Sequence, residues 1–99
     1  MIKIIAEVKC NLPIHGKLGA QQRENLYKDV GNLLDGKNGK DPSDYVKILV
    51  VFDADPSNSV VYNTLKNHFN DKISEYEGKK STRTDVVYVV TLSEFSINL

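Results

Sequence analysis

The chain has 99 residues, enough for one domain with one modest hydrophobic core. An apolar share of 40% and a charged share of 26% are ordinary for a globular protein, and 13 basic residues balance 13 acidic ones, which excludes a uniformly basic nucleic-acid binder. No window approaches the roughly 18 apolar residues of a membrane span, no secretory signal is recognisable, and the single cysteine cannot form an internal disulfide, so we expect a cytoplasmic protein.

The first half of the chain predicts a strand and a helix. The strand spans residues 2–10 and should end before Pro13, which has no backbone donor. After a loop with two glycines, a helix is predicted over residues 20–35, and Gly36 is expected to end it. The core-facing stripe of this helix has the spacing of one helical face and consists of Leu26, Val30, Leu33 and Leu34.

The second half predicts a strand, a helix and a strand. Residues 45–52 are apolar on both faces, which is typical of a central parallel strand with helices on both sides. A helix is predicted from about Ser59 to Tyr76, and a third strand over residues 85–92. The helix stripe comprises Val61, Leu65, Phe69, Ile73 and Tyr76. The order β-α-β-α-β predicts a single α/β domain over residues 1–99, with a small, mainly parallel three-stranded sheet flanked by two helices.

The first strand is expected to lie at an edge of this sheet, because no earlier element in the sequence can cover its outer side. An open edge normally receives a partner strand or some protection against unwanted pairing. We therefore expect a second chain beside it, in a homodimer or with another polypeptide, or else the tail at residues 93–99.

Two opposite charges stand inside this apolar strand. Glu7 and Lys9 alternate onto the same face, together with Lys3 and Ile5. Burying such a pair without a task or a partner costs free energy. One interpretation is a solvated edge whose charges discourage aggregation. The other interpretation is a chemical site.

The segment IIAEVKCNLP (residues 4–13) resembles the Glu-x-Lys strand of the PD-(D/E)xK nucleases, and specifically of type II restriction endonucleases. The similarity extends over residues 2–52 and implies a restriction-endonuclease-like core half. It also implies Mg²⁺-dependent hydrolysis of DNA phosphodiesters. Glu7 would be a metal ligand, the Val8 carbonyl a further ligand, and Lys9 would lie beside the scissile phosphate.

The second carboxylate of that family lies on a strand before the Glu-x-Lys strand, and the residues before Glu7 leave no room for one. Asp53 and Asp55 follow the neighbouring strand and could supply it, although Asp-x-Asp-Pro-Ser is also ordinary turn chemistry. We therefore expect the isolated chain to be inactive or to depend on another polypeptide.

Basic and polar side chains in two regions are candidate contacts to a DNA backbone. One group lies at the start of the first helix, where unsatisfied amides and the helix dipole attract phosphate. The other lies in the basic loop before the third strand. The alternative for both is an ordinary solvated surface. The candidates are Lys17, Gln22, Arg23, Lys79, Lys80 and Arg83.

Two other functions remain open. One is a non-catalytic α/β binding or regulatory protein of bacterial or phage origin that docks a partner through its edge strand. The other is a small-molecule site near Asn11, Asp53 and Ser93, at the carboxyl ends of the strands, where open α/β sheets usually bind ligands.

Overall fold

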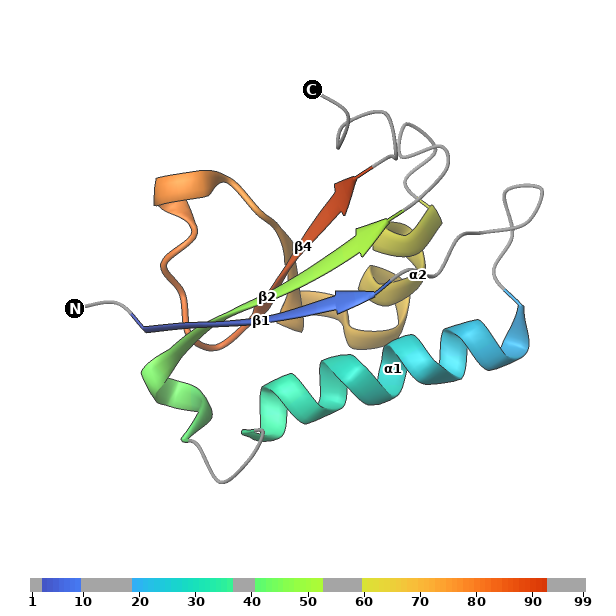
Figure 1. Cartoon of the computed structure of the whole chain (residues 1–99), viewed down its shortest axis with the longest axis horizontal. Helices are drawn as coiled ribbons and strands as arrows, with labels where there is room; N and C mark the ends of the chain where they lie inside the picture. Colours follow the sequence, from blue (N-terminus) through green and yellow to red (C-terminus); the bar gives the residue numbers. More distant parts are fainter. Residues whose placement is uncertain (1–2, 10–18, 37–40, 53–59, 93–99) are drawn as a thin grey trace.

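The computed structural model describes four stretches of the chain, residues 3–9, 19–36, 41–52 and 60–92. In chain order they contain β1 (Lys3–Lys9), α1 (Ala20–Asp35), β2 (Tyr45–Phe52), α2 (Val60–Phe69), β3 (Ile73–Glu75) and β4 (Val87–Leu92). Short 3₁₀ turns occupy Pro42–Asp44, Asn70–Lys72 and Gly78–Lys80. The strands form one parallel sheet in the order β1-β2-β4-β3 (Figure 1).

Helix α1 has the predicted bounds. At its start the Gly19 N–H donates a hydrogen bond to Gln22 Oε1 at 2.9 Å. At its end Gly36 has a φ of 90°, a conformation that glycine adopts without a steric penalty. Three members of the predicted stripe are buried and the fourth is half-buried against them, so the prediction of this helix and its face is confirmed: Leu26, Val30, Leu33 and Leu34.

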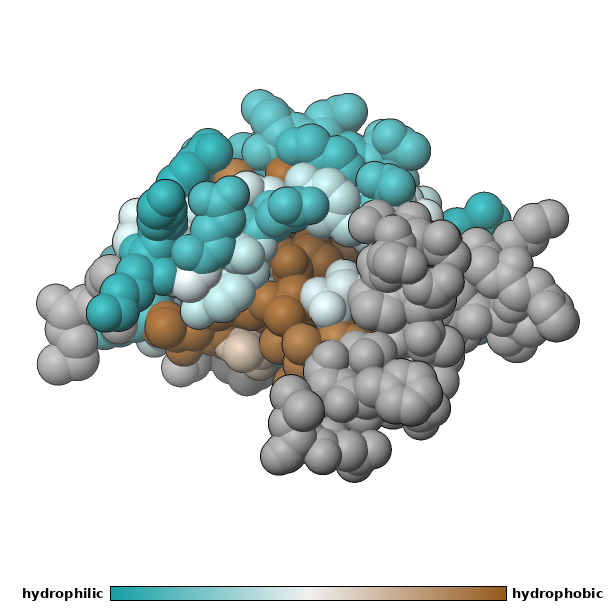
Figure 2. Space-filling view, turned by 90° about the horizontal axis from the view of Figure 1, so that it is seen from above, coloured by the Kyte–Doolittle hydropathy of each residue, from teal (hydrophilic) through white to brown (hydrophobic). Residues whose placement is uncertain are grey.

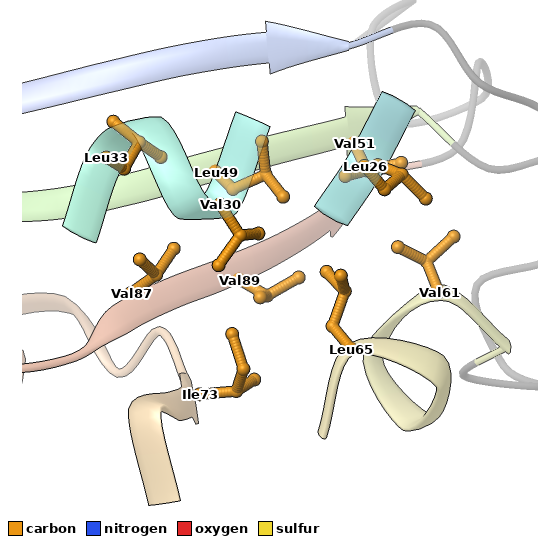
Figure 3. Packing of buried hydrophobic residues seen from close by; sticks show 10 residues of the cluster. All are labelled: Leu26, Val30, Leu33, Leu49, Val51, Val61, Leu65, Ile73, Val87 and Val89. Carbon is orange, nitrogen blue, oxygen red and sulfur yellow. The ribbon is translucent and has the colours of Figure 1, made fainter. Parts of the chain in front are cut away.

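Both helices pack against the same face of the sheet, which we call the helix face. Side chains from α1 and α2 meet alternate residues of β2, β3 and β4 there and form the main hydrophobic core (Figure 3). Ten buried residues make up this cluster: Leu26, Val30, Leu33, Leu49, Val51, Val61, Leu65, Ile73, Val87 and Val89. Ile5 of β1 packs against its margin.

The second helix is shorter than predicted and ends at Phe69 instead of Tyr76. Asn70 has a φ of 55°, in the left-handed region that asparagine tolerates better than most residues, and a 3₁₀ turn then redirects the chain. Ile73 is buried as predicted, but it belongs to strand β3. Tyr76 is 43% exposed, which corrects its assignment to the buried stripe.

The described stretches therefore form a sheet of four strands, and the prediction of three is wrong. Strand β3 pairs with β4 over Ile73–Glu75, and β4 lies between β2 and β3. Strand β4 begins at Val87, two residues later than the start predicted for the third strand. The α/β class and the parallel pairing are confirmed, whereas the restriction-endonuclease-like core half is not.

The opposite face of the sheet, which we call the open face, carries no α-helix among the described residues. Its strand residues include Ile4, Ala6, Val8, Val46, Ile48, Val50, Tyr88 and Val90. The segment at 76–84 covers part of this face, since the Tyr88 hydroxyl accepts a hydrogen bond from the Arg83 backbone N–H at 2.9 Å. The prediction that helices cover both faces of the strand at 45–52 is therefore wrong.

The connections explain why β1 lies at an edge. From β1 to β2 and from β2 to β3 the chain moves across the sheet in one direction, with a helix on the helix face each time. From β3 to β4 it moves back in the other direction, across the open face. All three crossovers thus share one handedness, as parallel sheets require. The prediction that β1 is an edge strand is confirmed.

Candidate functional site

Glu7 lies on the helix face of β1 in register with Leu49 of β2, and the backbone of Lys9 is in register with Val51. The Glu7 side chain is half-buried, whereas the structure describes only the backbone of Lys9. Val8 lies between them and points to the open face, where it is 58% exposed. The predicted sharing of one face by Glu7 and Lys9 agrees with the register.

A magnesium site would need several oxygen ligands around Glu7. The four described stretches contain no group of three or more His, Cys, Asp or Glu side chains that could hold a metal ion. Asp53 and Asp55 lie outside the described residues. Glu7 and the Val8 carbonyl alone do not fit Mg²⁺, so the nuclease chemistry stays a prediction.

The two groups of candidate DNA contacts lie on different sides of the sheet. Arg23 is exposed in the first turn of α1, on the helix face, while the half-buried Gln22 side chain caps the helix. Lys79 and Lys80 are exposed in the segment that crosses the open face. Lys17 lies outside the described residues. The described members therefore do not form one continuous basic surface.

Arg83, the remaining candidate, forms an ion pair with Asp85. Its Nη2 lies 2.7 Å from Oδ2 and its Nε donates to Oδ1 at 3.0 Å, so the contact is bidentate. The hydrogen bond from Arg83 lowers the pKa of the Asp85 carboxyl, and the same contact raises the pKa of the guanidinium. Because this guanidinium already holds a carboxylate, it is less available to a phosphate.

Lys47 is a charged residue that the sequence analysis did not single out. It lies in the middle of β2 and is only 1% exposed. Its Nζ donates to the carbonyl oxygens of Pro42 and Thr84, and to that of Tyr45 at 3.2 Å. Lys47 thus ties the segment before β2 to the segment before β4. The signal that could have revealed it is a lysine inside a run that is apolar on both faces.

A cleft of about 450 Å³ lies beside Lys47, at the amino ends of β2 and β4. Its charged lining comprises Asp35, Lys47, Lys72 and Asp85. The Lys47 amine is held by three carbonyl groups, so it stabilises the fold and has no donor to spare for a ligand. Ligands of open α/β sheets usually bind at the carboxyl ends, where Asn11, Asp53 and Ser93 lie outside the described residues.

The outer edge of β1 has the features of an interaction site. Strand β1 pairs with β2 on one side, and no described residue pairs with it on the other. Ile4 is 60% and Val8 58% exposed on its open face. Figure 2 shows the molecule from the side opposite α1, with an apolar patch bordered by hydrophilic residues.

A groove continues this apolar surface. It has a volume of about 220 Å³ and lies between β1–β2 and the segment at 76–84. Ile4, Val46 and Ile48 form its apolar side, and Tyr76 and Lys79 lie across from them. The groove therefore opens next to the exposed end of β1.

No helix in the described stretches is long and apolar enough to cross a membrane. No protein-family model, curated protein or solved structure matches the chain.

Proposed function

We propose that the chain is a non-catalytic α/β binding module that docks an extended segment of a partner along the edge of β1. The observation that carries this proposal is the exposure of Ile4 and Val8, at 60% and 58%, on an edge strand of seven residues. An edge strand offers backbone donors and acceptors to an incoming strand, and the alternating side chains add specificity.

The groove beside Ile4 supports the same function. An added strand places every second side chain on the open face, next to Ile4, which lines the groove together with Val46 and Ile48. One apolar side chain of the partner can therefore enter the groove, and Lys79 at its rim favours an acidic neighbour.

The charges on β1 affect which strands can pair with its outer edge. Natural edge strands are protected by charges, prolines or bulges. Within the strand, β1 carries Lys3 and Glu7 on its helix face, but its open face is apolar and it contains no proline. Its charges thus limit unspecific pairing, while the apolar residues favour a partner that can cover them.

Binding of a peptide tests this function. We expect a labelled peptide of alternating valine and threonine with one aspartate to bind the chain and to slow amide hydrogen exchange in β1. The double variant Ile4→Lys, Val8→Lys should weaken this binding at least about tenfold, because it removes the apolar contacts and adds two charges. Fluorescence anisotropy and hydrogen exchange measure the two effects.

A matched control adds the same two positive charges at positions away from β1. The variant Gln21→Lys, Asn25→Lys adds two lysines on the exposed side of α1 and should bind the peptide like the wild type. A wild-type chain that binds no alternating peptide and shows no protection of β1 would contradict the proposal.

The nuclease alternative predicts a different result. The observation that favours it is the half-buried position of Glu7 on the helix face of a parallel strand that also bears Lys9. On this alternative, calorimetry detects Mg²⁺ or Mn²⁺ binding that is lost in Glu7→Ala, and nicking of a supercoiled plasmid is lost in Lys9→Ala. Absence of Glu7-dependent metal binding in the wild type would remove it.

A further inference from the structure

We propose that the partner docked by β1 is a second copy of the same chain. The two β1 strands pair antiparallel about a two-fold axis that is perpendicular to the sheet. This axis lies midway between the Ile5 residues of the two copies, and we call it the axis through Ile5. This inference rests on the proposed function, since it uses the same edge and names what occupies it. Self-pairing of identical edges is the simplest closed arrangement, because a two-fold axis satisfies both copies at once.

The charges of β1 are arranged for this pairing. Lys3 and Glu7 lie on the same face of the strand, two residues before and two residues after Ile5. An axis through Ile5 therefore places Lys3 of each copy directly opposite Glu7 of the other copy, and it does so twice. Opposite charges in this position stabilise an antiparallel pair. On the open face, Ile4 of each copy lies opposite Ala6 of the other.

The two side chains that would pair are not fully buried. Lys3 is exposed, and Glu7 is half-buried and already makes a contact within its own chain, which pairing with a second copy would have to share or replace. The Lys3 Nζ lies 5.8 Å from the centre of the Tyr45 ring, close to the limit of about 6 Å for a cation–π contact, so this contact holds it weakly. The flexible stem of Lys3 can thus turn toward a carboxylate at the edge.

Other registers of the same pairing either bring like charges together or pair only three residues of the described strand. The helix faces of both copies lie on the same side of the combined sheet, so directly opposed residues must belong to the same face. This holds only for registers in which one residue of β1 faces its own copy across the axis. An axis through Ala6 sets Lys3 opposite Lys9, and an axis through Glu7 sets the two Glu7 residues opposite each other. An axis through Ile4 pairs only residues 3–5 of the described strand. An axis through Val8 sets Glu7 opposite Lys9, but it pairs only residues 7–9. Among the registers that pair at least five described residues, the axis through Ile5 is the one that joins opposite charges.

The helix layer leaves room for the second copy. Helix α1 packs over β2 and β4, and in Figure 3 β1 lies to one side of it. The two-fold axis keeps the helices of both copies on the same face of the combined sheet, with the two β1 strands between them. The dimer then has one continuous sheet without a free β1 edge.

Charge exchange between positions 3 and 7 tests the register. Lys3→Glu alone sets two carboxylates opposite each other, and Glu7→Lys alone sets two ammonium groups opposite each other, so each should weaken the dimer about tenfold or more. An equimolar mixture of the two variants should dimerise like the wild type, because both pairs in the mixed dimer again join opposite charges. Sedimentation velocity and energy transfer between labelled chains measure this.

A control pair separates this effect from general attraction between oppositely charged chains. Lys28→Glu and Glu24→Lys make the same changes in net charge on exposed positions of α1. Each should dimerise like the wild type, alone and in the mixture. If the α1 pair shows the same loss and rescue as the β1 pair, the register is wrong.

A disulfide locates the axis directly. In a Cys10→Ser background, Ile5→Cys should crosslink two chains on oxidation, because the residue on the axis faces its own copy within disulfide reach. Ala6→Cys in the same background should crosslink poorly. Efficient crosslinking at Ala6 and not at Ile5 would overturn the axis through Ile5.

The outcomes separate this inference from the function on which it rests. In one outcome, the double variant Ile4→Lys, Val8→Lys abolishes the dimer, but the single variants Lys3→Glu and Glu7→Lys leave it unchanged. This outcome overturns the Lys3–Glu7 register and supports docking at β1. A chain that is monomeric at every concentration and still binds the alternating peptide overturns the second copy as partner and leaves the proposed function standing. A monomer that binds no peptide overturns both.

Discussion

Replacing Lys47 by methionine lowers the free energy of unfolding by about 2 kcal/mol, since three carbonyl groups then lose a charged donor. The carbonyl groups belong to Pro42, Tyr45 and Thr84, and they point to the buried amine of Lys47. Methionine has a similar volume and keeps the packing of the aliphatic stem, so the variant removes mainly the hydrogen bonds. Denaturation in urea, followed by circular dichroism, measures the loss.

A second effect opposes this loss, because the variant also removes a buried charge whose desolvation is costly. The three hydrogen bonds decide the sign, since each unsatisfied buried acceptor costs roughly 1–3 kcal/mol. Lys72→Met is the matched control: Lys72 lines the same cleft but is exposed, so its replacement should change stability by less than about 0.5 kcal/mol. A Lys47→Met variant as stable as the wild type would contradict a stabilising role of the amine.

The pH dependence of this effect has a definite sign. Burial lowers the pKa of the Lys47 amine below its ordinary value of 10.5, although Asp85 and Asp41 oppose the change. Between the folded pKa and 10.5 the unfolded chain binds more protons than the folded chain, so the Lys47 contribution to stability increases as the pH rises. The difference in stability between wild type and Lys47→Met should therefore grow in that interval.

Replacing Ile73 by alanine lowers the free energy of unfolding by about 2–4 kcal/mol, because it leaves a cavity in the core. Ile73 is 1% exposed and lies in register with Val87 in the pair β3–β4. The measurement is again equilibrium denaturation, and it tests the assignment of residues 73–75 to a strand.

Tyr76→Ala is the control for Ile73. A helix that continued to Tyr76 would bury both side chains on one stripe, and their removal would then cost similar free energy. In the structure Tyr76 is 43% exposed, so Tyr76→Ala should cost less than about 1 kcal/mol. Equal losses at the two positions would contradict β3.

The first helix could be predicted from local signals, but the end of the second could not. Helix α1 has a regular apolar spacing and a glycine just after its last residue, and both act within a few residues. In the second helix, Ile73 follows Phe69 at helical spacing and no glycine or proline separates them. Ile73 is buried by pairing with β4, which is a long-range contact that the spacing cannot reveal.

The position of the candidate site was predicted in part. The edge position of β1 was predicted correctly, but alternation alone does not tell which face of a strand meets the helices. The apolar Ile4 and Val8 are on the open face, and the charged Glu7 is on the helix face. Lys47 was missed because one of its carbonyl partners, Thr84, lies 37 residues later in the sequence, and the fold alone brings the two together.

Strand β4 is the last described strand in the chain, yet it lies between β2 and β3. During synthesis on the ribosome, β3 has no described strand to pair with until residues 87–92 have left the exit tunnel. The nascent chain therefore exposes the apolar side chains of β2 and of both helices until then. We expect the four described strands to form their core in one step once β4 is available, and the earlier segments to be prone to aggregation until then.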